Sequence, residues 1–156
     1  MTSVLLPGSY DPVTLGHLEL IRRASGIYDR VYAVVFINPD KQYLFSAEER
    51  VKMLSLATEE LDNVTVGFSD GYVVDYMRKN GINKIIKGYR NERDLEYERC
   101  QAEYNFANGG FETELWEAGP DMQGISSTKA RELIKNGSSL GEILPEKVIS
   151  YIENYQ

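Results

Sequence analysis

A turn near the start of the chain carries the residue types best suited to chemistry. Residues 8–17 read G-S-Y-D-P-V-T-L-G-H, and His17 is the only histidine of the chain. Glycine lets a backbone approach a ligand closely, and a helix that begins after Thr14 would offer free N–H groups and a partial positive charge to an anion. The segment therefore predicts a phosphate-binding turn with an imidazole beside it.

Two common nucleotide-binding motifs are absent from the sequence. Neither G-x-G-x-x-G nor G-x-x-x-x-G-K-[ST] occurs, which excludes a dinucleotide fingerprint and a P-loop. Residues 126–129 spell S-x-x-K, but S-D-N and K-T-G, which accompany that motif in penicillin-binding enzymes, are missing. The turn at residues 8–17 therefore remains the main candidate for a functional site.

The elements that must position this turn alternate between strands and helices. Apolar runs predict strands at 4–6, 31–37, 64–68, 82–87 and 112–116, and helical patterns begin near 15, 46, 73, 94, 127 and 145. This alternation predicts an α/β fold: a single domain over residues 1–156, with a parallel five-stranded sheet and helices on both faces. Such a sheet binds ligands at the carboxyl ends of its strands, near the point where strand order reverses.

Cations and small hydroxyl side chains follow the later strands, at the edge where a ligand is expected. Lys41 comes after the second strand, and Lys87 and Arg90 stand at the end of the fourth. The fork of an arginine suits phosphate oxygens, and the hydroxyls that open a helix at residues 124–129 offer donors to an anion. If the substrates are anionic, these cations are gathered locally against a formal net charge of −7.

Composition excludes several classes of protein. The net charge of −7 argues against a nucleic-acid partner. A single cysteine, Cys100, excludes an internal disulfide, and no Cys/His cluster could hold zinc. Neither a signal peptide nor an apolar run long enough to span a bilayer is found, so we expect a cytoplasmic protein without a membrane partner.

Several motifs together resemble one family. T-x-G-H after G-S-Y-D-P resembles the (H/T)-x-G-H signature of nucleotidyltransferases. With N-P-D-K, S-A-E-E-R, K-G-Y-R-N-E-R-D-L-E-Y-E and I-S-S-T, the chain looks like the bacterial phosphopantetheine adenylyltransferases over essentially its whole length. The resemblance implies a Rossmann-like domain that transfers the adenylyl group of ATP to 4′-phosphopantetheine, giving dephospho-coenzyme A and pyrophosphate in coenzyme A synthesis. It also implies Mg²⁺ as cofactor and a homohexamer.

The resemblance further implies which residues form the site. His17 would stabilise the transition state. The implied ATP-binding residues are Ser9, Tyr10, His17, Gly88, Tyr89, Arg90, Glu98, Met122, Gln123, Gly124, Ile125, Ser126, Ser127 and Thr128. The implied acceptor-binding residues are Ser9, Lys41, Val73 and Lys87, and no residue is implied as a metal ligand.

Two site positions depart from the family pattern, and two alternative functions stay open. Ser9 stands where threonine is usual, and Lys87 stands where arginine is usual. A lysine keeps the charge but loses bidentate geometry, so this departure bears on acceptor affinity. The alternatives are a sister nucleotidyltransferase, acting on nicotinamide mononucleotide or glycerol phosphate, and a noncatalytic adenine-nucleotide sensor.

Overall fold

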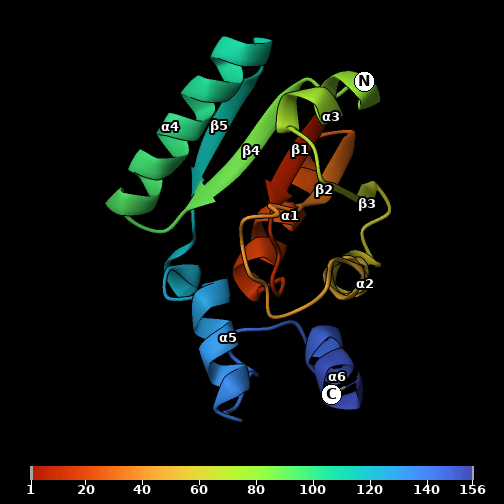
Figure 1. The fold of residues 1–156 in the computed structure, drawn as a ribbon, viewed down its shortest axis with the longest axis vertical. Coiled ribbons are helices and arrows are strands. Elements are labelled where there is room, and N and C mark those ends of the chain that lie inside the picture. The colour runs from red at the N-terminus through yellow and green to blue at the C-terminus, as the bar shows by residue number, and fades with distance from the viewer. Residues whose placement is uncertain (1, 156) are drawn as a thin grey trace.

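The fold alternates strands and helices along the whole described chain. The structure is a computed structural model that describes residues 2–155, without the side chain of Tyr155. The elements are β1 (Ser3–Gly8), α1 (Leu15–Ile27), β2 (Arg30–Phe36), α2 (Ala47–Thr58), β3 (Val64–Ser69), α3 (Val73–Asn80), β4 (Lys84–Tyr89), α4 (Glu92–Gly109), β5 (Glu112–Glu117), a 3-10 turn (Pro120–Met122), α5 (Ser127–Lys135) and α6 (Glu146–Tyr155) (Figure 1). The predicted α/β class is confirmed.

The sheet has five parallel strands in the order β3-β2-β1-β4-β5. The chain first builds outward from β1 to β3, and then returns to place β4 on the other side of β1. The strand order therefore reverses between β1 and β4. In a parallel sheet this reversal separates the two following connections and leaves a crevice at the carboxyl ends of the two strands.

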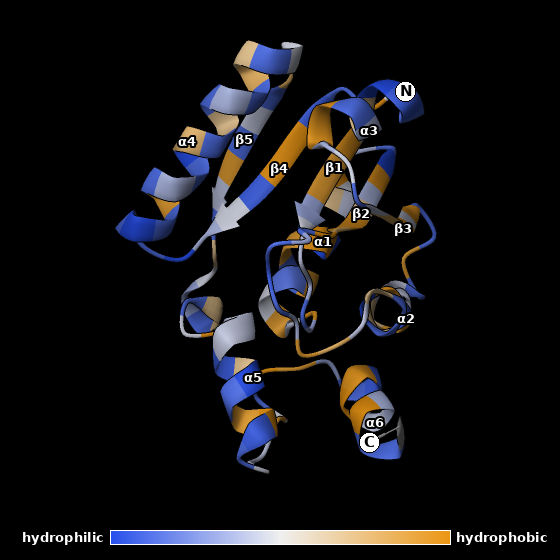
Figure 2. Cartoon of the chain, viewed as in Figure 1, coloured by the Kyte–Doolittle hydropathy of each residue, from blue (hydrophilic) through white to orange (hydrophobic). Residues whose placement is uncertain are grey.

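Two apolar clusters pack against opposite faces of the sheet. Val4 and Leu6 of β1 belong to the larger cluster, which also takes buried residues from α1, α2, α5 and α6. Leu5, between them in sequence, belongs to a second cluster with Met77 of α3 and Ile85 of β4. Side chains alternate across a strand, so neighbouring residues reach opposite faces. Figure 2 shows apolar residues concentrated on the central strands, as a sheet covered on both faces requires.

Most elements differ from their predicted bounds by one or two residues, and the differences at β4 and α4 bear on the site. The fourth strand spans Lys84–Tyr89 instead of 82–87, because the N–H of Ile82 bonds Met77 O and closes α3. This shift places Lys87 and Gly88 inside the strand. Helix α4 begins two residues earlier than predicted, at an Asn91 cap, and continues to Gly109 before Gly110 ends it at φ 73°. A residue without a Cβ adopts that left-handed conformation without steric cost.

Candidate active site

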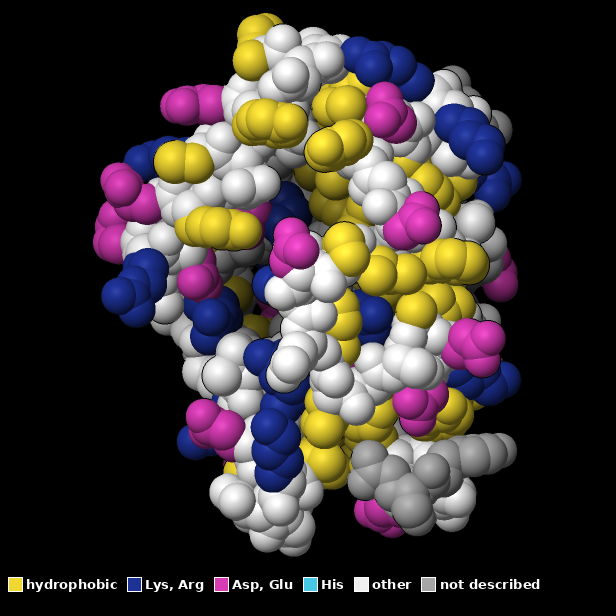
Figure 3. Space-filling model, in the orientation of Figure 1, with side chains coloured by type: hydrophobic (Ala, Val, Ile, Leu, Met, Phe, Trp, Pro, Cys, Tyr) yellow, Lys and Arg dark blue, Asp and Glu magenta, His cyan; other side chains and the backbone are white. Residues whose placement is uncertain are grey.

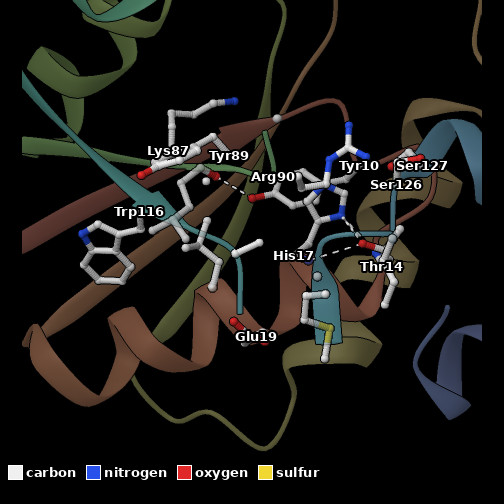
Figure 4. A pocket seen from close by; sticks show the side chains of 18 of the residues that line it. Tyr10, Thr14, His17, Glu19, Lys87, Tyr89, Arg90, Trp116, Ser126 and Ser127 are labelled. Carbon is white, nitrogen blue, oxygen red and sulfur yellow. Dashed lines mark hydrogen bonds between the residues drawn. The ribbon is translucent and has the colours of Figure 1, made fainter. Parts of the chain in front are cut away.

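A pocket of about 310 Å³ lies at the carboxyl ends of β1 and β4. Its walls come from the end of β1, the first turns of α1, the end of β4, and the connection from β5 to α5 (Figure 4). This is the crevice that the reversal of strand order leaves open. In the space-filling view of Figure 3, acidic and basic side chains are interspersed over the visible face.

His17 is held in place by the cap of its own helix. Thr14 is the N-cap of α1, and its side chain accepts a hydrogen bond from the His17 N–H. The Thr14 N–H in turn donates to His17 Nδ1 at 3.0 Å. A backbone N–H can only donate, so Nδ1 carries no proton, and in the neutral ring the proton is on Nε2. The cap therefore fixes both the tautomer and the orientation of the imidazole.

The pKa of His17 is lowered to about 4, well below its ordinary value. Burial is the main cause, because removal from water disfavours the charged imidazolium, and the positive charges of Lys87 and Arg90 lower it further. The imidazole is thus neutral at physiological pH and presents one N–H donor. Figure 4 shows the Arg90 side chain reaching toward the same part of the pocket.

The turn between β1 and α1 is bonded to the protein on several sides. The carboxylate of Asp11 is buried and accepts hydrogen bonds from Leu44 N and Phe45 N, at 2.8 and 2.9 Å. Arg131 of α5 donates to Asp11 O at 2.9 Å, and Ser127 Oγ donates to Pro12 O at 2.9 Å. The turn is therefore tied to the loop before α2 and to the start of α5.

The β4 side of the pocket carries two cations, and each faces a carboxylate of α4. Lys87 Nζ donates to Pro7 O at 3.2 Å and lies 3.6 Å from Glu98 Oε2. Arg90 Nε lies 3.1 Å from Asp94 Oδ2, which also accepts from Arg90 N at 3.2 Å. Burial raises the pKa of Glu98, although Lys87 acts in the opposite direction. Each of these two cations at the pocket is therefore paired with a carboxylate of α4.

Comparisons with known proteins agree with this geometry. The cytidylyltransferase-like family model matches residues 5–133. A phosphopantetheine adenylyltransferase of Clostridium novyi (strain NT) is 39% identical over 155 residues, which cover 99% of this chain and 96% of that protein. The chain belongs to the phosphopantetheine adenylyltransferase family. It is a nucleotidyltransferase, as the T-x-G-H motif of the sequence predicts.

Most of the site residues predicted from the family resemblance meet in this one pocket. The predicted residues that line it are Ser9, Tyr10, His17, Lys87, Gly88, Tyr89, Arg90, Met122, Ile125, Ser126, Ser127 and Thr128. They come from segments as far apart in sequence as β1 and α5, which the sheet brings together. Their individual contacts with a phosphopantetheine adenylyltransferase's substrates stay predictions.

Five predicted residues lie outside the lining of this pocket: Lys41, Val73, Glu98, Gln123 and Gly124. Lys41 is exposed in the loop after β2. Val73 begins α3 and packs against the apolar cluster on the opposite face of the sheet. Glu98 is only 8% exposed and stands behind Lys87, which lies between it and the pocket.

Several residues of the pocket were not predicted as individual site residues. Gly8, Thr14 and Gly16 belong to the predicted phosphate-binding turn, and the remaining ones are Leu6, Pro7, Glu19, Leu20, Arg23, Ile86, Trp116 and Ala118. Glu19 and Arg23 follow Gly16 at helical spacing, so the helical period of α1 could have identified them. The guanidinium of Arg23 lies 4.9 Å from the centre of the Trp116 ring, a contact between α1 and β5 that no sequence pattern marks.

Proposed function

We propose that the chain transfers the adenylyl group of ATP to 4′-phosphopantetheine, giving dephospho-coenzyme A and pyrophosphate. The observation that carries the proposal is the state of His17: a neutral imidazole, fixed by Thr14, whose Nε2–H is left to donate in a pocket that Lys87 and Arg90 also line. The similarity to the Clostridium novyi protein named phosphopantetheine adenylyltransferase supports the choice of substrates.

The reaction needs no covalent nucleophile on the protein. A phosphate oxygen of the acceptor attacks the α-phosphorus of ATP in line and forms the new P–O bond, while the bond to the bridging oxygen breaks and pyrophosphate leaves. Catalysis of such a step rests on positioning and on stabilising charge at the transferring group. His17 Nε2–H donates to an α-phosphate oxygen that gains charge in the transition state.

The other pocket residues take supporting roles in this proposal. Lys87 and Arg90 exchange their carboxylate partners for phosphate oxygens, Lys87 on the acceptor side and Arg90 on the ATP side. Ser126 caps α5, whose first N–H groups with Ser127 and Thr128 face the nucleotide. Lys41 and Val73 belong to an acceptor side that extends beyond the described pocket.

Mg²⁺, the oligomeric state and the location in the cell are also part of the proposal. No group of three or more His, Cys, Asp or Glu side chains within residues 2–155 could hold a metal ion. These residues do not form a metal cage, so Mg²⁺ enters with ATP, whose phosphates are its ligands. No helix in the same range is long and apolar enough to cross a membrane. We propose a cytoplasmic homohexamer, which light scattering tests by showing a mass of six chains or of one.

Pyrophosphate release by the purified protein tests the reaction. Release should require both ATP and 4′-phosphopantetheine, and CTP should not replace ATP. Nicotinamide mononucleotide and glycerol phosphate serve as control acceptors, because either would support release if the chain were a sister nucleotidyltransferase. ATP binding by calorimetry without release, at any acceptor, would instead indicate a nucleotide sensor and overturn the proposal.

A further inference from the structure

A buried cation lies next to the β1–α1 turn on the side away from α5. Arg50 of α2 is only 2% exposed. Its Nη1 donates to Ser9 O at 3.1 Å, and its Nε donates to Phe45 O at 3.2 Å. The ring of Tyr43 lies against the guanidinium, 3.8 Å from its centre. Within residues 2–155, Arg50 forms no ion pair with a carboxylate at 4.0 Å or less.

Burial of the Arg50 guanidinium is unfavourable in free energy unless the charge serves a function. A buried charge loses its hydration, and protein carbonyls and an aromatic face restore only part of it. An apolar side chain of α2 would fill the same space without that cost. The two hydrogen bonds show where the charge acts: on the loop before α2, and on the Ser9 carbonyl at the pocket.

The bond to Ser9 O determines which way the next N–H points. The Ser9–Tyr10 peptide is trans and planar, so its carbonyl and its N–H point in opposite directions. With Ser9 O directed at Arg50, the Tyr10 N–H is directed away from α2. Ser9 and Tyr10 both line the pocket. Arg50 therefore fixes the direction of a backbone donor on a residue that lines the pocket.

The conformation of Tyr10 makes this support necessary. Tyr10 has φ 48°, in the left-handed region that residues with a Cβ rarely adopt. Such a conformation persists only when the surroundings hold it. The Tyr10 hydroxyl donates to Leu6 O at 2.8 Å, and its ring packs 4.9 Å from the His17 ring. These contacts hold the side chain, and Arg50 holds the peptide before it.

We infer that Arg50 is a positioning residue of the nucleotide site, which fixes the Ser9–Tyr10 peptide so that the Tyr10 N–H binds a phosphate oxygen of ATP. The identity of the anion rests on the proposed function. Arg50 itself touches no substrate, because it lies outside the pocket lining. Its loss therefore acts on ATP affinity through the turn.

The test compares three variants by calorimetric ATP binding without acceptor, and by kcat and KM for both substrates. Arg50→Gln removes the charge. Arg50→Lys keeps the charge, but its single ammonium group replaces the two separate nitrogens that donate to Ser9 O and Phe45 O. Met53→Ala is the matched control, because Met53 is fully buried on the same helix and belongs to the apolar core. Met53→Ala lowers the stability of α2 and removes neither of the two hydrogen bonds that Arg50 donates to Ser9 O and Phe45 O. Thermal unfolding of all three proteins measures that common loss.

ATP affinity should fall about ten- to a hundredfold in Arg50→Gln, as expected for a charge-assisted hydrogen bond. It should recover in part in Arg50→Lys and stay within twofold of the parent in Met53→Ala. If Arg50→Gln does not fold, the test rests on Arg50→Lys alone, which should lose more ATP affinity than Met53→Ala. The inference is overturned if the Arg50 variants lose no more ATP affinity than Met53→Ala. A parent that binds ATP without releasing pyrophosphate contradicts the proposed reaction instead, and leaves the binding comparison intact.

Discussion

The two sides of the pocket are built on different principles. On the β1–α1 side, His17, the turn and its carbonyls are each bonded to the protein interior, through Thr14, Arg50 and Arg131. On the β4–α4 side, Lys87 and Arg90 are paired with carboxylates that a substrate can displace. The first side offers fixed neutral donors, and the second offers charge that changes partners.

This difference assigns the two sides different steps of the reaction. A donor that stabilises developing charge acts best when its position needs no reorganisation. A cation that captures a polyanion can be held in an ion pair until the substrate binds. Substitution of His17 should therefore change kcat, and substitutions of Lys87 and Arg90 should change KM.

The largest effect, on kcat, is expected at His17. His17→Ala should lower kcat about a hundred- to a thousandfold, because one donor to the transition state is worth about 2.7–4 kcal/mol. ATP should still bind, since the backbone N–H groups and Arg90 remain. Steady-state kinetics combined with calorimetric ATP binding measure both quantities. Retention of more than about a tenth of the parent kcat would make His17 a structural residue.

The second effect is a dependence of stability on pH. The folded pKa of His17 is about 4, so between that value and its ordinary one the unfolded chain binds the extra proton. Stability from this residue is complete above about pH 6.5 and is lost toward pH 4, in total about 3 kcal/mol. Urea unfolding of the parent and His17→Gln at pH 7 and pH 4.5 should show a smaller acid loss in the variant.

The acid loss of stability has to be compared between the parent and His17→Gln, because other groups titrate in the same pH range. Glu98 has a raised folded pKa, so its contribution changes in the opposite sense, gaining as pH falls. That contribution is common to parent and variant. Equal acid losses in both proteins would show that His17 titrates normally. The NMR signal of the single imidazole gives an independent check, and it should stay that of the neutral Nε2–H form down to pH 5.5.

A smaller effect, on KM, is expected at Lys87. Lys87→Ala should raise KM for 4′-phosphopantetheine by about tenfold, as for the loss of one charged hydrogen bond, and should change KM for ATP much less. Lys87→Arg should be tolerated, because it restores the residue that the family usually carries. Initial rates with each substrate varied in turn separate the two constants. Equal changes in both would place Lys87 on the wrong side of the site.

The smallest effect is expected when a competing carboxylate is removed. Asp94→Asn frees Arg90 for phosphate, and because the pair is partly exposed, ATP affinity should rise by less than about fivefold. Asp75→Asn is the matched control, since Asp75 pairs with Arg78 on the surface of α3 and lies outside the pocket lining. A fall in affinity in Asp94→Asn, absent from the control, would show that the carboxylate orients Arg90 for the substrate.

The sheet and the place of the pocket were predictable because they follow from short-range patterns. Apolar runs that alternate with amphipathic helices require a parallel sheet, and the G-S-Y-D-P turn falls at the end of its first strand. Helix α3 begins at Val73, where the sequence predicts its start, and Gly81 ends it with φ 67°. These features depend on residues close together in the chain.

The parts that were missed depend on contacts between distant elements. Arg50 ends the S-A-E-E-R segment and reads as a polar residue on a capped helix, yet its partners are carbonyls of Ser9 and Phe45. The position of Glu98 behind Lys87 likewise depends on how α4 packs beside β4. No pattern within a single segment encodes such contacts, so burial of a charged side chain is found only in three dimensions.

The hydrogen bond from Thr14 N–H to His17 Nδ1 couples two properties that most proteins can vary separately. The same bond completes the cap of α1 and selects the ring nitrogen that donates in the pocket. A substitution at position 17 therefore alters the start of a helix, and a change in the backbone at position 14 alters the chemistry of an imidazole.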